Sequence, residues 1–399
     1  MLVKLFIYLA AVLPAVLAAP RYKCYNPEPT TGVPTQTVTQ TTIQTTIQTT
    51  AEITTQTATP YPSPEPQTPV YLNWTTVSGY FLQDETTTDP NGFDYISTNF
   101  GLIDRAYDSD AEFDPNGEKS QWQRFAHHIG ELNKNSDAST EYKVLLMARH
   151  GEGWHNAAES YYGTPAWNCY WGQLSGNGTA VWEDPHLTPA GELEAIKAND
   201  FWRKQIDEHK QPAPESFYTS PLSRCTVTAN LTFANLGFDN FYPIVKEFLR
   251  EGVSIRTCDH RPSKTYITNM FPFYKFEEGF AELDPLYDGV KYETSEAQDL
   301  RNFNGLTDVF TKDKNTWISF TAHSGEITSL LRVLGHRAFR LATGQAIPVL
   351  VKVVSNLPKS TTTTIAPWTT PTVCPAPPVT SIANQGCVCT ATATPTTTI

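Results

Sequence analysis

The sequence predicts an α/β protein: a three-layer α/β/α sandwich with a mainly parallel central sheet. Short aliphatic or β-branched runs are typical of buried strands, and they occupy residues 143–148, 216–219, 316–322 and 347–354. Amphipathic helical patterns lie between or beside them, over residues 120–132, 189–206 and 326–334. Because parallel strands need a crossover connection, this alternation favours a parallel sheet with helices on both faces.

Each of the first three expected strands ends at a polar residue. These residues are Arg149, Ser220 and His323. The fourth strand, residues 347–354, has Pro348 near its start, where a missing N–H group is tolerated.

Each expected helix carries apolar residues at helical spacing. Thr188 is placed to cap the helix 189–206, and Pro189 suits its first position. The apolar face of this helix is expected to contain Leu193, Ile196, Trp202 and Ile206. The other two helices carry the stripes Trp122, Phe125, Ile129 and Leu132, and Ile327, Leu330, Leu331 and Leu334.

The composition excludes several classes of protein. Of the 399 residues, 40% are hydrophobic and 12% aromatic, which is enough for a sizeable core and excludes a fully disordered or fibrous chain. The net charge of −12, from 29 Lys+Arg and 41 Asp+Glu, argues against nucleic acid and anionic membranes as partners. An anionic substrate must therefore be bound by a few placed cations inside a site.

Residues 1–19 are typical of a secretory signal peptide. Lys4 precedes an apolar run from Leu5 to Leu17, and the small residues Ala18 and Ala19 provide a cleavage site. We therefore expect a secreted protein, extracellular or in the cell wall, with no membrane span. Three Asn-x-Ser/Thr sequons fit a secreted glycoprotein, and they begin at Asn73, Asn177 and Asn230.

Low-complexity flanks enclose the expected catalytic domain, residues 70–358. Residues 20–69 and 359–399 are rich in Thr and Pro, so we expect disordered, O-glycosylated stalks. Association with a cell wall through these flanks is a further expectation. The seven cysteines leave at least one thiol free or paired with another molecule, and the sequence alone does not give their pairing.

The polar strand ends bring cations and imidazoles into one region. In an α/β sheet the site lies beyond the carboxyl ends of the strands, so Arg149, His150, Arg224 and His323 are expected to converge. Guanidinium groups bind phosphate oxygens bidentately and stay charged at every working pH. A neutral imidazole beside them can attack phosphorus and form a phosphohistidine.

Five motifs, in order between residues 140 and 335, resemble the signature of the histidine phosphatase superfamily, also called phosphoglycerate mutase-like. They are Arg149-His150-Gly151-Glu152 with Asn156, Leu187-Thr188-Pro189-Ala190-Gly191, Ser220-Pro221-Leu222-Ser223-Arg224 with Thr228-Ala229, Leu249-Arg250-Glu251, and Ala322-His323-Ser324-Gly325. Two further strings, His155-Asn156 and Cys258-Asp259-His260-Arg261, are similar to a fungal secreted subgroup. Ser324 is a departure, because many relatives have Gly there.

The resemblance implies a role for each matched residue. His150 would be the nucleophile, and Arg149, Arg224 and His323 would hold the phosphoryl oxygens. Glu251 would protonate the leaving oxygen and then activate water. The implied catalytic set is therefore His150, Glu251 and His323. The phosphate-binding set is Arg149, Arg224 and Asn156, with no metal and no cofactor.

Several neighbouring residues have other expected roles. If Glu251 is not the acid, the alternatives are Glu247, Glu278, Glu282 and Asp284. A solvated polar loop is expected to carry His260, Arg261 and Lys264, with contact to the substrate as the alternative. Cys225 is expected to be a buried packing residue.

The expected function is hydrolysis of phosphate monoesters through a phosphohistidine, on a small phosphorylated substrate that the sequence does not identify. One alternative is phosphoryl transfer of the phosphoglycerate mutase type, and another is a low-activity cell-wall or matrix protein that binds an anion. A leaving-group acid argues against a pure binder. The sequence has no His-Glu-x-x-His zinc motif, P-loop, Gly-x-Ser-x-Gly elbow or dinucleotide fingerprint.

Overall fold

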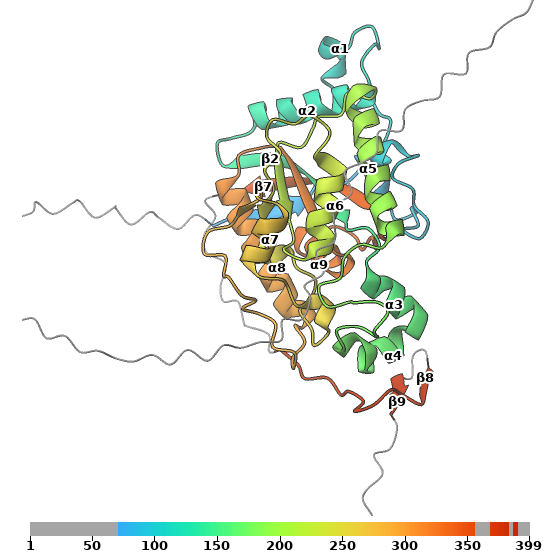
Figure 1. Cartoon of the computed structure of the whole chain (residues 1–399). Coiled ribbons are helices and arrows are strands. Elements are labelled where there is room, and N and C mark those ends of the chain that lie inside the picture. Colours follow the sequence, from blue (N-terminus) through green and yellow to red (C-terminus); the bar gives the residue numbers. More distant parts are fainter. Residues whose placement is uncertain (1–70, 356–367, 383–385, 390–399) are drawn as a thin grey trace, which may run out of the picture. The chain divides into compact units, whose positions relative to one another are not determined.

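A computed structural model describes residues 71–355, 368–382 and 386–389, all within one compact unit, Gln67–Ile399. Its described part contains a seven-stranded sheet in the order β1-β7-β2-β6-β3-β4-β5 (Figure 1). The strands are β1 (Asn73–Thr76), β2 (Thr140–Arg149), β3 (Ser216–Thr219), β4 (Ile244–Val245), β5 (Lys275–Phe276), β6 (Trp317–Ala322) and β7 (Ala346–Val354). A separate hairpin pairs β8 (Thr380–Ile382) with β9 (Gly386–Val388). The predicted signal peptide and first stalk lie outside the described residues.

The predicted mainly parallel sheet is confirmed. Strand β2 pairs in parallel with β6, β6 with β3, β3 with β4, and β4 with β5. The exceptions are β7, antiparallel to β2, and β1, antiparallel to β7. The chain between helix α9 (Ser324–Leu334) and β7 explains the reversal. It returns to the carboxyl edge of the sheet, where Gly344 N–H donates to the His150 carbonyl at 3.1 Å.

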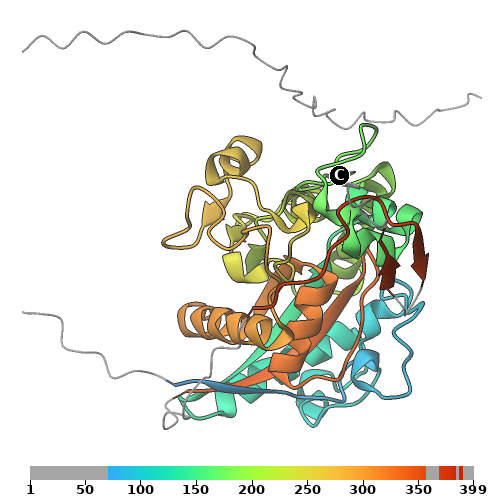
Figure 2. The ribbon, with the colours of Figure 1, turned by 90° about the horizontal axis from the view of Figure 1, so that it is seen from below.

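Helices connect the strands and cover both faces of the sheet (Figures 1 and 2). The α-helices are α1 (Asp110–Phe113), α2 (Gln121–Asn135), α3 (Trp154–Tyr162), α4 (Thr164–Cys169), α5 (Pro189–Asp207), α6 (Ser223–Phe233), α7 (Lys264–Met270), α8 (Ser295–Lys312) and α9 (Ser324–Leu334). Short 3-10 helices are η1 (Leu82–Asp84), η2 (Asn99–Gly101), η3 (Trp171–Gln173), η4 (Glu247–Leu249) and η5 (Thr257–Asp259).

Strand β2 shows how the sequence forms two cores. Successive strand residues point to opposite faces, so Leu145 and Met147 pack on one side while Val144 and Leu146 pack on the other. The first pair joins a core with α8 and α9, and the second joins a core with α2, α5 and α6. The three-layer arrangement follows from this alternation, with helices on each face.

Helix α5 begins as the sequence predicts, but only part of its expected apolar face is buried: Trp202 lies in the core and Ile206 packs against it. The Thr188 hydroxyl accepts a hydrogen bond from Gly191 N–H, and Pro189 is the first helical residue. Leu193 and Ile196, expected in the core, are 66% and 44% exposed. The reason lies at Gly191, which packs so tightly that a Cβ atom there would sit 2.1 Å from the Glu152 carbonyl oxygen. That contact turns the face of Gly191, Ala195 and Trp202 inward.

Part of the predicted disordered tail, residues 359–399, is folded against the domain. A disulfide joins Cys169 of α4 to Cys387 of β9, and a second joins Cys374 to Cys389. Figures 1 and 2 show the β8–β9 hairpin beside α4. The expectation of a disordered tail is therefore wrong for residues 368–382 and 386–389. Covalent linkage across 218 residues is a constraint that Thr and Pro content does not reveal.

Two of the expected glycosylation sites are accessible. Asn73 and Asn177 are exposed, whereas Asn230 is half-buried within α6. Among the described residues, no helix has both the length and the apolar character needed to cross a membrane. Strand β1 begins at Asn73 and β7 ends at Val354, inside the predicted limits of 70–358.

The disulfide between Cys169 and Cys387 should contribute more stability than the one between Cys374 and Cys389. The first spans 218 residues and the second 15, and the loss of chain entropy in the unfolded state grows with loop length. For loops of these lengths we expect losses of about 5 and about 3 kcal/mol in the free energy of unfolding. Paired Ser variants, Cys169→Ser with Cys387→Ser and Cys374→Ser with Cys389→Ser, leave no new thiol. Denaturant titrations in which the first pair loses no more than the second would contradict this assignment.

Candidate active site

The carboxyl ends of β2, β3 and β6 meet at one edge of the sheet. His150 N–H donates to the Ala322 carbonyl at 3.0 Å, and Ser220 N–H donates to the Thr321 carbonyl at 3.0 Å. The residues that follow these three strands are thus locked in register by backbone hydrogen bonds. Side chains that follow the strands therefore start from fixed positions.

His150 is held in a defined protonation state. Its side chain is buried, and Nδ1 lies 2.7 Å from the Gly151 carbonyl oxygen. A carbonyl oxygen only accepts hydrogen bonds, so Nδ1 carries the proton and Nε2 is unprotonated, with a lone pair directed toward Arg224. Burial, followed by the charges of Arg224 and Arg149, holds the pKa of His150 well below its usual range. The imidazole is therefore neutral and nucleophilic at Nε2.

Arg224 links the two histidines of the site. Its Nε lies 3.2 Å from His150 Nε2 and 3.2 Å from His323 Nδ1, and its Nη1 donates to the Cys258 carbonyl at 2.8 Å. Asp184 fixes the start of α6, because its Oδ1 accepts from Ser223 N–H at 2.9 Å. The guanidinium is buried, and all of its partners are neutral acceptors.

His323 completes the pair of imidazoles. Its ring centroid is 5.0 Å from that of His150, and its Nε2 lies 2.8 Å from Ser220 Oγ. Because Nδ1 accepts from Arg224, Nε2 carries the proton and donates to Ser220. Burial, then Arg224 and the neighbouring histidines, hold the pKa of His323 well below its usual range.

Arg149 offers unused donors to the same region. Its Nη1 donates to the Leu341 carbonyl at 2.9 Å. No residue in the described part of the chain accepts from its Nε or Nη2. Burial lowers the pKa of Arg149 and Glu251 opposes that effect, while Arg340 and Arg224 add to it. A guanidinium nevertheless stays charged.

Glu251 is fixed by two backbone donors, one in its own loop and one at the start of α9. Oε1 accepts from Gly252 N–H at 3.0 Å, and Oε2 accepts from Gly325 N–H at 3.1 Å. A Cβ atom at Gly325 would lie 2.3 Å from Glu251 Oε1, so glycine is needed there for the carboxylate to fit. Glu251 therefore contacts Gly325, two residues after His323 in the chain, and its charge acts on Arg149.

Two of the alternative carboxylates have structural partners instead. Asp284 accepts from both Arg250 Nη groups, at 2.6 and 2.7 Å. Glu247 pairs with Arg261 and Arg250. The expected solvated loop is thus wrong for Arg261, which is fully buried because Glu247 and several carbonyls accept its hydrogen bonds. His260 stays partly exposed and stacks on Tyr287.

Asn156 is not brought into the cluster. Its Oδ1 accepts from Gly153 N–H at 3.0 Å, which closes the first turn of α3. Among the described residues, no hydrogen bond joins it to His150, Arg149, Arg224 or His323. The motif match supplied the residue type but not the direction of its side chain.

Two residues near the cluster were not assigned to it from the sequence. His155 lies with its ring centroid 5.5 Å from that of His150. Cys225 Sγ lies 3.4 Å from His323 Nε2, although burial of Cys225 was expected. One feature of the sequence indicated that they lie near the cluster: His155 directly precedes Asn156, and Cys225 directly follows Arg224.

Glu326 is a buried carboxyl group beside the site. It follows Gly325, accepts from Gln298 Nε2 at 2.9 Å and lies 3.4 Å from Arg301. Burial raises the pKa of Glu326 to about 8, with Glu251 and Glu293 adding to the shift and Arg301 opposing it. Burial and the neighbouring carboxylates therefore outweigh the single cation.

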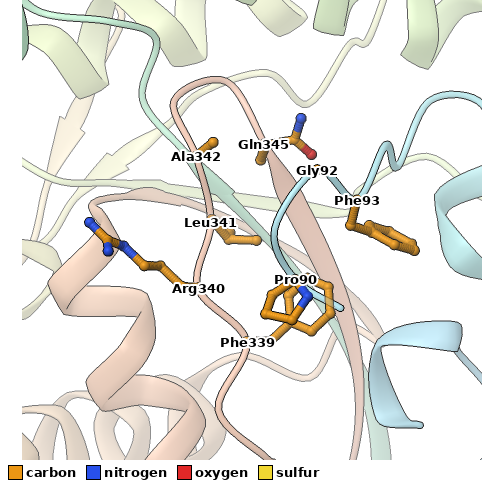
Figure 3. A pocket seen from close by; sticks show the side chains of 8 residues that line it. All are labelled: Pro90, Gly92, Phe93, Phe339, Arg340, Leu341, Ala342 and Gln345. Atoms are coloured by element: carbon orange, nitrogen blue, oxygen red, sulfur yellow. The ribbon is translucent and has the colours of Figure 1, made fainter. Parts of the chain in front are cut away.

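Figure 3 shows a small pocket next to the segment that anchors Arg149. Its volume is about 50 Å³, and its lining consists of Pro90, Gly92, Phe93, Phe339, Arg340, Leu341, Ala342 and Gln345. None of the six predicted site residues lines it. The chemistry of the cluster, rather than this hollow, identifies the candidate active site.

Comparison with known proteins gives three relatives in fungi. A probable phosphoglycerate mutase of Arthroderma benhamiae is 46% identical over 288 residues, which cover 71% of this chain and 86% of that protein. Phosphomutase-like protein 3 of Candida albicans is 39% identical, covering 55% and 68%. A probable phosphoglycerate mutase of Saccharomyces cerevisiae is 30% identical, covering 59% and 85%. No family model matches the chain.

Solved structures give weaker similarities. Phosphoserine phosphatase from Entamoeba histolytica is 17% identical, with a TM-score of 0.31, covering 52% of this chain and 89% of that one. A mycobacterial glucosyl-3-phosphoglycerate phosphatase is 16% identical, with a TM-score of 0.32, covering 52% and 92%. Because TM-scores this low do not establish a shared fold, the relationship rests on the sequence relatives.

The carboxyl group of Glu326 should make stability depend on pH. The pKa of Glu326 in the folded protein, about 8, lies above the ordinary value of 4.5. The protonated carboxyl group therefore contributes fully to the free energy of unfolding below pH 4.5, and this contribution is lost as the pH rises through 8. Glu326→Gln mimics the protonated form, so its melting temperature should exceed that of wild type increasingly from pH 5 to pH 8.

Titration of the buried histidines changes the melting temperatures of wild type and of Glu326→Gln equally. It therefore cancels in the difference between the two melting temperatures. Exposed Glu192→Gln in α5 is the control, for which the gap should not change with pH. A constant gap for Glu326→Gln would show that the carboxyl group is already ionised in the folded protein.

Proposed function

The chain belongs to the phosphoglycerate mutase-like histidine phosphatase superfamily, and we propose that it hydrolyses phosphate monoesters through a phosphohistidine at His150. One observation carries this proposal. The lone pair of His150 Nε2 faces a buried guanidinium that has no carboxylate partner among the described residues. A phosphoryl group at that position would meet a nucleophile and a positive charge together.

The first step forms the phosphohistidine. His150 Nε2 attacks phosphorus, and the bond between phosphorus and the leaving oxygen breaks. Glu251 donates a proton to that oxygen, so an alcohol leaves. Arg149 and Arg224 stabilise the negative charge on the non-bridging oxygens, and His323 accepts the hydrogen bond that positions the Arg224 guanidinium.

The second step releases phosphate. Glu251, now ionised, takes a proton from water, and the oxygen of that water attacks phosphorus. The bond between phosphorus and His150 Nε2 breaks and the imidazole is neutral again. One residue thus serves as acid in the first step and as base in the second, because the proton given to the leaving oxygen is replaced by one taken from water.

A simple monoester suits this site. The whole chain carries a net charge of −12, and its cluster holds the cations Arg149 and Arg224. A highly phosphorylated molecule would meet general repulsion with few cations to offset it. This supports a small substrate with one phosphoryl group.

Phosphoglycerate mutase activity is the second candidate. Two of the relatives are named probable phosphoglycerate mutases, and the third is named phosphomutase-like. The first step would be the same, but the phosphoryl group would then pass to another hydroxyl of a phosphorylated metabolite. A protein that only binds an anion would not need Glu251 as a leaving-group acid.

Secretion favours hydrolysis over transfer. The apolar run from Leu5 to Leu17 and exposed sequons at Asn73 and Asn177 support a secretory route. A mutase depends on a bisphosphorylated primer from inside the cell, whereas water is available everywhere. We therefore place the activity outside the cell or in the cell wall, with the Thr-rich flanks as the means of association.

Supplying phosphoglycerate with and without its bisphosphorylated form separates the two activities. We expect purified protein to release free phosphate in both cases, with little positional isomer. Isomer formation that greatly outpaces phosphate release would show that the protein is a mutase.

The variant His150→Ala tests the nucleophile. It should lose nearly all turnover without unfolding, because His150 contributes little to the hydrophobic cores. Activity retained in His150→Ala would exclude a phosphohistidine there.

The acid role of Glu251 predicts a dependence on the leaving group. Glu251→Gln should slow hydrolysis of an alkyl phosphate about 100-fold or more, since an alkoxide is a poor leaving group that needs the proton. Hydrolysis of 4-nitrophenyl phosphate should slow far less. Exposed Glu278→Gln is the control and should change neither rate. Equal losses on both substrates would move the acid role to another group.

A further inference from the structure

His155 is a buried imidazole whose ring nitrogens form no hydrogen bond with any described residue. It lies in the first turn of α3 and is 8% exposed. In the described part of the chain, no residue hydrogen-bonds either ring nitrogen, and Nδ1 is fully enclosed. Buried polar groups are nearly always hydrogen-bonded, so such an exception needs an explanation.

A second buried histidine shows the ordinary arrangement. His336 is also 8% exposed, yet its Nδ1 lies 2.7 Å from the Arg337 carbonyl and its Nε2 lies 3.1 Å from Asp84 Oδ1. Equal burial in the same chain is thus compatible with full hydrogen bonding. The unpaired ring of His155 is a property of its place.

His155 lies beside the cluster formed by His150, Arg224 and His323. The ring centroid of His155 is 5.5 Å from that of His150, and the charges of Arg224 and Arg149 act on it. Burial and these cations keep the pKa of His155 well below its usual range, so the ring is neutral and offers one N–H donor. A ligand group that accepts a hydrogen bond from His155 would lie near Arg224 and Arg149. Their positive charges favour an anionic group at that position.

The position of the ring indicates which nitrogen is available. A Cβ atom at Gly153 would lie 2.7 Å from His155 Nδ1, so this nitrogen packs against the backbone of its own turn. An enclosed nitrogen tolerates a lone pair better than an unsatisfied N–H. The proton therefore belongs on Nε2, where a ligand oxygen can accept it.

We propose that His155 Nε2–H donates a hydrogen bond to a phosphoryl oxygen of the substrate and of the phosphohistidine on His150. This inference rests on the proposed function and extends it, because it assigns a third imidazole to the anion pocket. The chemistry recognised is the tetrahedral, doubly charged oxyanion, whatever alcohol is attached to it.

Orthovanadate, a phosphate mimic, tests the contact by binding alone. With the full chain, we expect His155→Phe to weaken orthovanadate binding at least about tenfold, the scale of one hydrogen bond to a charged group. Its melting temperature should be unchanged or higher, because an unpaired polar ring is replaced by an apolar one. The matched control, His336→Phe, should lower the melting temperature and leave orthovanadate binding unchanged.

Two further variants locate the donor. The amide nitrogen of Gln reaches about as far as Nε2, and that of Asn about as far as Nδ1. His155→Gln should therefore recover orthovanadate binding relative to His155→Phe, whereas His155→Asn should not. Wild-type affinity in His155→Phe, or no recovery in His155→Gln, would overturn the proposal even if a variant is less stable.

The binding measurement also separates this inference from the proposed function. If wild type binds orthovanadate through His155 but releases no phosphate from any ester, hydrolysis is wrong and the contact stands. If wild type hydrolyses esters and His155→Phe binds orthovanadate normally, only the contact is wrong. Absence of orthovanadate binding by wild type would overturn the contact, and if phosphate release from esters is absent as well, the proposed function is also wrong.

Discussion

The buried guanidinium of Arg224 is the constraint on which the site depends. A charge in the protein interior is normally paired with an opposite charge, yet the partners of Arg224 are two imidazole nitrogens and the Cys258 carbonyl. These acceptors take hydrogen bonds from Nε and Nη1 without cancelling the charge of the guanidinium. Burial, and then the charge of Arg224, keep His150 and His323 neutral. Charge for an anion and a lone pair for attack therefore come from one arrangement.

A second set of buried arginines supports the loop that carries Glu251, the proposed acid. Arg250, next to Glu251 in sequence, is held by Asp284, while Arg261 is held by Glu247. These pairs fix the loop that carries Glu251, and Gly325 leaves room for its carboxylate. Removing one partner of such a buried pair is costly, because the other is left uncompensated. The loop is therefore rigid at the point where a proton would have to move.

The polar residues at the strand ends could be predicted to meet because hydrophobic runs and parallel pairing determine where these strands end. Glu251 is assigned through the resemblance to the histidine phosphatase superfamily, not from this pattern. The paired roles of Glu247 and Asp284 could not be predicted, since their arginine partners are defined by loop packing. The exposed face of α5 depends on how closely Gly191 approaches Glu152, a distance that periodicity does not contain. The sequence does not show that the Asn156 side chain bonds to the first turn of its own helix. Nor does it show that the ring of His155 lacks a hydrogen bond to any described residue. The link from Cys169 to Cys387 joins segments too far apart for spacing to reveal.

The thiol of Cys225 has a consequence for how the site meets oxidants. It contacts His323, but it is completely buried, and burial holds its pKa far above the usual range. Oxidants and alkylating agents react with the thiolate, a form that is scarcely populated here. The folded protein is thereby protected at the centre of its site despite an unpaired cysteine there. Labelling of Cys225 would report the opening of the structure around His323, which makes this residue a built-in probe of local unfolding.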